Sequence, residues 1–134
     1  MTDNEFLIDS NIIIYHLNGD AIATNFLERN LEISAISQIT YIEVLSFGYS
    51  SAAEESQVDE LLKQFTVYDI NHDISKQALI NRKIKKIKLP DNLIVSTAQV
   101  HGLTLVTRNI KDFNHFEVKV INPFALTLDN AKMG

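Results

Sequence analysis

The sequence predicts an α/β fold in which helices cover both faces of a short central parallel sheet. Short, nearly all-apolar runs alternate with longer amphipathic segments, as expected of strands joined by helical crossovers. The strands lack the alternation of a half-exposed sheet, so both faces should be buried. No linker or repeat divides the 134 residues, which contain two prolines and four glycines. We expect a single domain over 1–134, with a compact core at about 5–124 and a flexible C-terminal tail.

Five short apolar runs are expected to form the strands. Each is bounded by polar or turn-forming residues, and its length suits a strand better than a helix. In chain order the strands cover 6–9, 32–36, 66–70, 103–107 and 118–121.

Six segments between these strands are expected to be helical, because their apolar residues recur at three- and four-residue spacings. In chain order the helices cover 10–17, 21–30, 38–47, 52–65, 72–86 and 92–101. Ser37 is expected to cap the third helix, and Gly48 to end it.

The last two helices carry further expectations. On the helix over 72–86, Leu79 and Ile84 are expected to face inward together with Ile74 and Ala78. Leu89-Pro90 should interrupt the chain, so that Asp91 opens the following helix.

Composition limits the classes of protein to which the chain can belong. Hydrophobic residues make up 46% and charged residues 22%, which is typical of a globular domain. The chain has no cysteine, so it has no disulfides and no thiolate metal site, which fits a reducing, cytoplasmic setting. Its acidic start and short apolar run resemble neither a signal peptide nor a membrane span. A net charge of −5 argues against coating nucleic acid by charge alone, but allows a local basic patch or a bound cation.

Four acidic residues lie where a parallel sheet would place a ligand site, outside the carboxyl ends of its strands. Asp9 ends the first strand, Glu43 lies on the helix after the second, Asp91 starts a late helix, and Asp112 follows the LVT strand. Each also has a simpler explanation. Asp9 and Asp91 are well placed to cap helices, Glu43 could face solvent, and Asp112 could be a loop acid.

Glu43 fits its simpler explanation least well, because Ile42, Val44 and Leu45 surround it and its helix contains no lysine or arginine. If Asp9, Glu43 and Asp91 converge, their charges repel until protons or a cation neutralise them. Carboxylate oxygens without cysteine favour Mg²⁺ or Mn²⁺. Such an ion would acidify a bound water and orient a phosphodiester.

Four blocks of sequence together resemble a PIN domain, and in particular the small single-domain members of the VapC toxin type. In chain order they are LIDSNIIIYHL, ISQITYIEVLSFG, KLPDNLIVSTAQVHGLTLVTRNIKDF and VKVINP. The resemblance implies a three-layer α/β/α sandwich and a metal-dependent endoribonuclease. It also implies a homodimer, and an antitoxin that blocks the site and often inserts an arginine or lysine near the acids. The substrate would be RNA, with transfer RNA as one candidate.

The same resemblance assigns roles to individual residues. Metal binding falls to Asp9, Glu43 and Asp91, and supporting polar roles fall to Ser10, Asn11 and Thr40. Family members commonly carry an aspartate directly after the position of Arg108, where this chain has Asn109. Asp112 is the candidate replacement for that charge among the catalytic acids, with Asn109 in support. This departure leaves open whether one or two metal ions bind.

The only dense basic run precedes Asp91 and contains Arg82, Lys83, Lys85, Lys86 and Lys88. It is either a solvated helix end, where cations meet the helix dipole favourably, or an edge that contacts RNA phosphates. On the second reading the candidate RNA contacts are Arg82, Lys86, Lys88 and Arg108.

Two other functions compete with the nuclease. A catalytically silent PIN-like module that binds RNA or protein would be compatible with Asn109. A phosphoacceptor receiver domain shares the parallel sheet and acidic pocket, but it would need a second acid beside Asp9 and a lysine just past a late strand. Here Ser10-Asn11 follow Asp9, and Arg108 follows Thr107.

Overall fold

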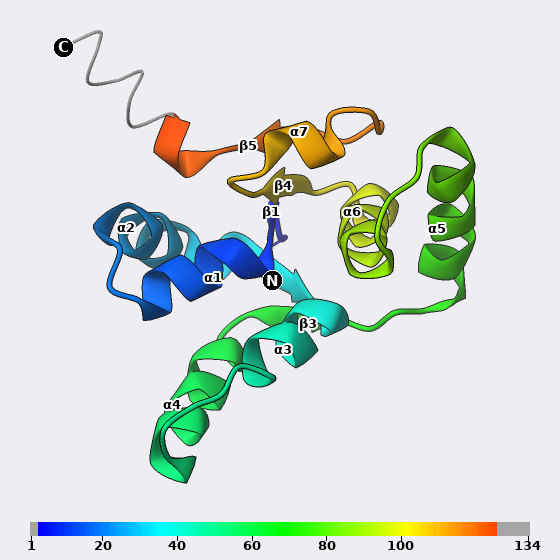
Figure 1. Ribbon diagram of the computed structural model, residues 1–134. Coiled ribbons are helices and arrows are strands. Elements are labelled where there is room, and N and C mark those ends of the chain that lie inside the picture. The colour runs from blue at the N-terminus through cyan, green and yellow to red at the C-terminus, as the bar shows by residue number, and fades with distance from the viewer. Residues whose placement is uncertain (1–2, 126–134) are drawn as a thin grey trace, which may run out of the picture.

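A computed structural model describes residues 3–125 and shows a five-stranded sheet with the order β3-β2-β1-β4-β5 (Figure 1). Every pair of neighbouring strands is parallel. The strands are β1 (Phe6–Ile8), β2 (Ser34–Ser37), β3 (Thr66–Tyr68), β4 (Thr104–Val106) and β5 (Val120–Ile121). The predicted α/β fold with a parallel sheet is therefore confirmed. The expected flexible tail falls mostly on 126–134, outside the described residues.

Helices cover both faces of this sheet. They are α1 (Ser10–Leu17), α2 (Ala21–Asn30), the 3-10 helix η1 (Leu31–Ile33), α3 (Gln38–Leu45), α4 (Ala52–Leu62), α5 (His72–Ile84), α6 (Leu89–His101) and α7 (Ile110–Phe113). Figure 1 shows α1 and α2 on one side of the sheet and α6 on the other, with α5 lying outside α6. No helix in residues 3–125 is both long and apolar enough to cross a membrane.

Alternate residues of the strands enter two separate hydrophobic cores. Ile8, Ile36 and Val106 pack with side chains of α1, α2, α3 and α4. Their neighbours Leu7, Ala35 and Leu105 pack with α6 and with two buried phenylalanines near α7. Since successive side chains of a strand point to opposite faces, this division accounts for the nearly continuous apolar character of the strands.

The structure corrects several predicted boundaries. α3 ends at Leu45 with Ser46 as its cap, not at Gly48. α6 begins at Leu89, so Pro90 lies in its first turn and Asp91 does not open the helix. Proline is tolerated there because the first helical N–H groups have no intrahelical acceptor. The start of the predicted second strand is a 3-10 turn, and α7 was not predicted.

Helix α5 also exposes residues that were expected to be inside. Ile74 and Ala78 are buried, but Leu79 is 66% exposed and Ile84 is 59% exposed. The reason is that α5 packs on α6 at the outside of the molecule (Figure 1). It therefore buries only a narrow face.

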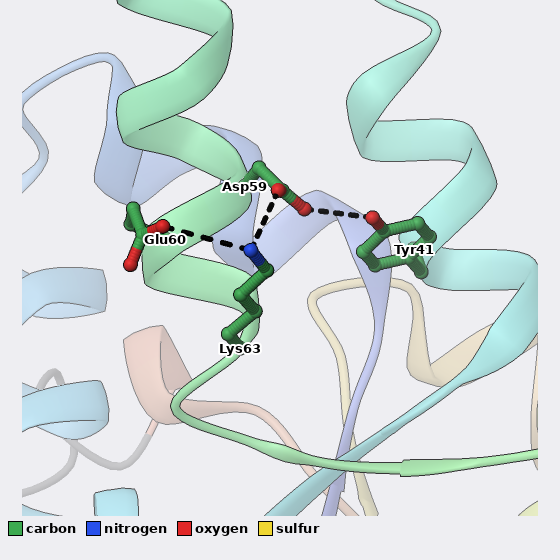
Figure 2. Close-up of polar contacts among 4 residues, drawn as sticks. All are labelled: Tyr41, Asp59, Glu60 and Lys63. Carbon is green, nitrogen blue, oxygen red and sulfur yellow. Dashed lines mark hydrogen bonds and ion pairs between the residues drawn. The ribbon is translucent and has the colours of Figure 1, made fainter.

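A polar contact links α3 to α4 beside the first core. The Tyr41 hydroxyl donates to Asp59 at 2.7 Å, and Lys63 forms ion pairs with Asp59 at 3.3 Å and with Glu60 at 3.6 Å (Figure 2). The hydrogen bond to Asp59 raises the pKa of Tyr41. This contact sets how α4 approaches α3, the helix that carries Glu43.

Candidate metal centre

Asp9 lies directly after the central strand β1, with only 6% of its surface exposed. It is the N-cap of α1 and accepts a hydrogen bond of 2.7 Å from the Ser10 backbone N–H. Its second carboxyl oxygen accepts from the Thr107 hydroxyl at 2.7 Å and from the Asn11 side-chain amide at 3.2 Å. The predicted helix-capping role of Asp9 is therefore confirmed, and one of its carboxyl oxygens also binds side chains from two other positions.

The pKa of Asp9 is raised from its usual 3.8 to about 6. Burial is the largest cause, and the charges of Asp91 and Glu43 raise the pKa further. Hydrogen bonds from Thr107 and from the Ser10 backbone act in the opposite direction. A buried carboxylate that also faces like charges is better stabilised by a cation than by the protein alone.

Glu43 lies on α3 and turns toward the start of α1. Its Oε1 accepts a hydrogen bond of 2.7 Å from the Ser10 hydroxyl, which also lies 3.2 Å from the Thr40 hydroxyl. Within residues 3–125 no lysine or arginine pairs with Glu43. Ser10 therefore connects the acid after β1 to the acid on α3.

Asp91, in the first turn of α6, completes the group. Its pKa is raised by partial burial, then by the charges of Asp112 and Glu43, and lowered by Lys88. Asp9 is therefore influenced by the charges of Asp91 and Glu43, and Asp91 by those of Asp112 and Glu43.

The oxygen atoms at this edge are the type of ligand that hard divalent cations prefer. Oxygen donors predominate, and neither a cysteine nor a histidine takes part in the hydrogen bonds of Asp9 or Glu43. In the described part of the chain, there is no group of three or more His, Cys, Asp or Glu side chains that could hold a metal ion. Mg²⁺ does not require such a group, because it keeps several waters and commonly uses one or two carboxylates.

The profile of the PIN domain family matches residues 6–119. The chain belongs to the PIN-domain family. This PIN domain is 34% identical to ribonuclease VapC10 of Mycobacterium tuberculosis over 127 residues, covering 90% of this chain and 93% of the relative. It is 31% identical to ribonuclease VapC2 of Methanocaldococcus jannaschii, covering 87% of this chain and 92% of the relative.

A solved structure agrees with these matches. A toxin-antitoxin complex from Klebsiella pneumoniae contains a chain with 37% identity and a TM-score of 0.79. The match covers 89% of this PIN domain and 98% of that chain.

Sequence reasoning gave no role to Thr107, which is fully buried at the end of β4. Besides donating to Asp9, its hydroxyl accepts from the Asn11 amide at 3.2 Å and from the Asn109 backbone N–H at 3.0 Å. The one available signal was its place, a hydroxyl residue directly after an apolar strand at the expected edge. Asn109 contributes its backbone here, while its side chain is exposed.

The predicted RNA contacts of this PIN domain lie in two places. Arg82, Lys86 and Lys88 line a groove of about 820 Å³ between α5 and α6, together with Asn92, the residue after Asp91. Arg108 lies apart from them at the end of β4, over the rings of Tyr15 and Phe124.

Proposed function

We propose that this PIN domain is an endoribonuclease that hydrolyses RNA phosphodiester bonds with the aid of Mg²⁺ or Mn²⁺, and that it is the toxin of a toxin–antitoxin pair. The observation that supports the proposal is the buried position of Asp9 at the carboxyl end of β1, where burial and the charges of Asp91 and Glu43 raise its pKa to about 6. Its ribonuclease relatives and its toxin–antitoxin structural neighbour support the same conclusion.

In this proposal Asp9, Glu43 and Asp91 hold the metal, and Asp112 adds charge beside Asp91. The ion would supply an acidified water and would offset charge on the leaving oxygen. Asn11 and Thr107 orient the Asp9 carboxylate, and Ser10, with Thr40 behind it, orients Glu43. Such indirect contacts commonly change metal affinity by about 10–100-fold.

The RNA would reach the acids along the basic edge of α5 and α6. Lys88 is close enough to lower the pKa of Asp91, and Arg82 and Lys86 line the adjoining groove. These cations give an acidic chain a local attachment for phosphates. A structured RNA such as a transfer RNA is a suitable class of substrate to test.

An antitoxin segment would occupy the apolar surface between α4 and the first two helices. Two adjoining pockets, of about 330 and 210 Å³, share His16 and Leu61. Their apolar linings include Val58, Leu27 and Phe65. A helix laid across them would fit the usual groove mode of peptide recognition.

The chain would also pair with a second copy through α5. Ile80 and Ile84, one turn apart, form an exposed apolar stripe on this helix, and Leu79 beside them lines the groove between α5 and α6. Asp73 lies near its start and Lys83 near its end, so two antiparallel α5 helices would bring opposite charges together. This arrangement is self-complementary, as a two-fold interface requires.

The deciding experiment incubates the purified protein with a panel of structured and unstructured RNAs in Mg²⁺ or Mn²⁺, and maps the cut sites by sequencing the fragments. We expect cleavage that stops with EDTA. Asp9→Asn and Asp91→Asn should lower the rate on the order of a hundredfold or more, because each removes a proposed metal ligand.

The matched control is Asp69→Asn, because Asp69 is exposed and shows no resolved contact with the four acids. It should cut at the wild-type rate. Folded wild-type protein that leaves the whole RNA panel intact with either metal would overturn the proposal.

The alternative is a catalytically silent PIN module, which Asn109 and the lack of a group of three or more potential metal ligands in residues 3–125 favour. Calorimetry separates the two functions. A silent module would bind RNA or protein without binding Mg²⁺ or Mn²⁺, whereas the nuclease should bind a divalent ion that Asp91→Asn weakens.

A further inference from the structure

Arg108 is an exposed arginine whose position is fixed from several sides. Its guanidinium carbon lies 5.0 Å from the ring centre of Tyr15 and 4.6 Å from that of Phe124. These two rings also pack edge to face, with centres 5.3 Å apart. Its backbone N–H lies 3.5 Å from the Asn11 side-chain oxygen, which ties it to the residue beside Asp9. The guanidinium is therefore held on an aromatic platform formed by Tyr15 and Phe124, while the backbone of Arg108 reaches Asn11.

This cation has no carboxylate partner among residues 3–125, since the ion pairs there all involve Lys63. A guanidinium lying over aromatic rings uses its faces, so its N–H edge remains free to bind a planar or tetrahedral anion. Arginine suits such a position because it presents several donors in one plane.

Arg108 also lines a hollow of about 420 Å³. Its lining includes Lys111, Asn109 and Asn122 as well as Arg108, and Asp112 lies in the same lining. The two cations favour a phosphate, and the two amides can hydrogen-bond to a sugar or base. Because Asp112 would repel a phosphate, the anion should bind at the Arg108 end.

Arg108 is also separate from the acids that would hold the metal. Its charge does not contribute to the pKa shifts of Asp9 and Asp91, whereas the charge of Lys88 lowers the pKa of Asp91. A phosphate held by Arg108 would nevertheless lie beside the one at the acids, because Arg108 directly follows Thr107, whose hydroxyl donates to Asp9. We propose that Arg108 and the hollow beside it form a subsite for a phosphate of single-stranded RNA that flanks the cleaved bond.

The proposal rests on the proposed nuclease function, and its test uses a short oligoribonucleotide that spans the mapped cut site. Binding is measured with Mg²⁺ present and with Asp91→Asn in every protein, so that the RNA stays intact. Arg108→Met keeps an apolar chain on the two rings but removes the charge. It should weaken binding about tenfold. The slope of log affinity against log salt should fall by about 0.7, the value for one single-strand phosphate contact.

Arg108→Lys keeps the charge without the planar donors and should give an intermediate loss. If Arg108→Met unfolds at the assay temperature, the binding loss of Arg108→Lys serves as the test instead. The matched control is Arg29→Met, which removes an exposed arginine from the last turn of α2. This variant should bind RNA as the parent does.

To identify the phosphate that Arg108 binds, each phosphate of the oligoribonucleotide is replaced in turn with an uncharged methylphosphonate. One replacement next to the cut site should weaken binding to the parent but leave binding to Arg108→Met unchanged. An equal effect on both proteins at every position would overturn the subsite, as would parent-like affinity of Arg108→Met. If either of these results is obtained and the wild-type protein still cuts RNA, only the subsite proposal is wrong. If the wild-type protein cuts no RNA, the proposed nuclease function is wrong.

Discussion

At the scale of the residue, Asp9 combines a structural and a chemical role. Its carboxylate caps α1 through the Ser10 N–H, and it also receives the Thr107 hydroxyl and the Asn11 amide. These bonds compensate only part of the cost of burying a charge beside Asp91 and Glu43, because the pKa remains raised. In the metal-free protein, burial of the Asp9 charge beside two other acids therefore destabilises the folded state.

This imbalance predicts how stability depends on pH. The Asp9 pKa is about 6 in the folded state against 3.8 ordinarily, so the folded protein holds this proton more tightly than the unfolded chain. Protonation of Asp9 therefore stabilises the folded state fully below pH about 4, and this stabilisation is lost as pH rises through about 6. The free energy of unfolding should fall by about 3 kcal/mol over this range. Asp91, whose pKa is also raised, acts in the same direction.

The measurement is urea unfolding of the metal-free protein across this pH range. Asp9→Asn cannot titrate at this position, so its stability relative to wild type should improve from acidic to neutral pH. Divalent metal should remove most of the wild-type loss, because an ion that binds only the folded state stabilises it. A constant difference between the two proteins at all pH values would contradict the prediction.

Thr107 predicts a second effect at this scale. Thr107→Val keeps the shape of the buried side chain but removes the hydroxyl that donates to Asp9. We expect a loss of about 1–3 kcal/mol in the free energy of unfolding and a 10–100-fold weaker Mn²⁺ affinity by calorimetry. Thr107→Ser retains the hydroxyl and should bind Mn²⁺ nearly as wild type does. Equal Mn²⁺ affinity in the valine variant would show that this contact does not orient the acid.

At the scale of the element, the pair α5 and α6 sets the position of Asp91. Asn81 on α5 is fully buried and donates to Ser96 at 3.0 Å and to Gln99 at 2.8 Å, both on α6. Asn92, the residue after Asp91, donates back to the Ala78 carbonyl at 2.9 Å. Buried polar groups of this kind fix how one helix is rotated against another.

Asn81→Leu should therefore affect both stability and the site. Loss of the amide leaves buried acceptors on α6 without their donor, which should cost about 2 kcal/mol in urea unfolding. Mn²⁺ binding should weaken because the first turn of α6 is no longer held in register. Ser75→Ala, on the exposed side of the same helix, is the control and should change stability by less than about 0.5 kcal/mol. If Asn81→Leu is destabilised but binds Mn²⁺ as wild type does, the hydrogen bonds of Asn81 stabilise the fold without positioning Asp91.

The elements also show what the sequence could reveal. The apolar runs predicted every strand, because burial on both faces leaves a clear pattern. The short turns Leu31–Ile33 and Ile110–Phe113 span too few residues to show a helical period. Leu79 was placed inside because helical spacing identifies an apolar stripe, but it cannot tell whether another helix covers that stripe.

At the scale of the whole molecule, parallel topology made the site partly predictable. Strand ends in such a sheet share one edge, so Asp9 could be placed near later acids from sequence order alone. The hydrogen-bond partners of those acids could not be predicted in this way, because the contact between Thr107 and Asp9 joins residues 98 positions apart. The aromatic platform of Arg108 was hidden for the same reason, because Tyr15 and Phe124 lie near opposite ends of the chain.

The exposed stripe of α5 gives a prediction for the assembled molecule. If two copies pair through this helix, sedimentation velocity should report a dimer. Ile80→Glu should then give a monomer, because it places a charge in an apolar interface. Val100→Glu introduces the same charge at another exposed apolar position and should leave the dimer intact. A monomeric wild type at high protein concentration would exclude this interface.

The central place of β1 also bears on how the protein is made in the cell. β4, the neighbour of β1 in the sheet, is translated nearly a hundred residues after β1. Until then Asp9 lacks Thr107, and for most of that time Asp91 has not been synthesised. A nascent chain that ends within α6 therefore lacks both Thr107 and Asp112 and would not bring the four acids together.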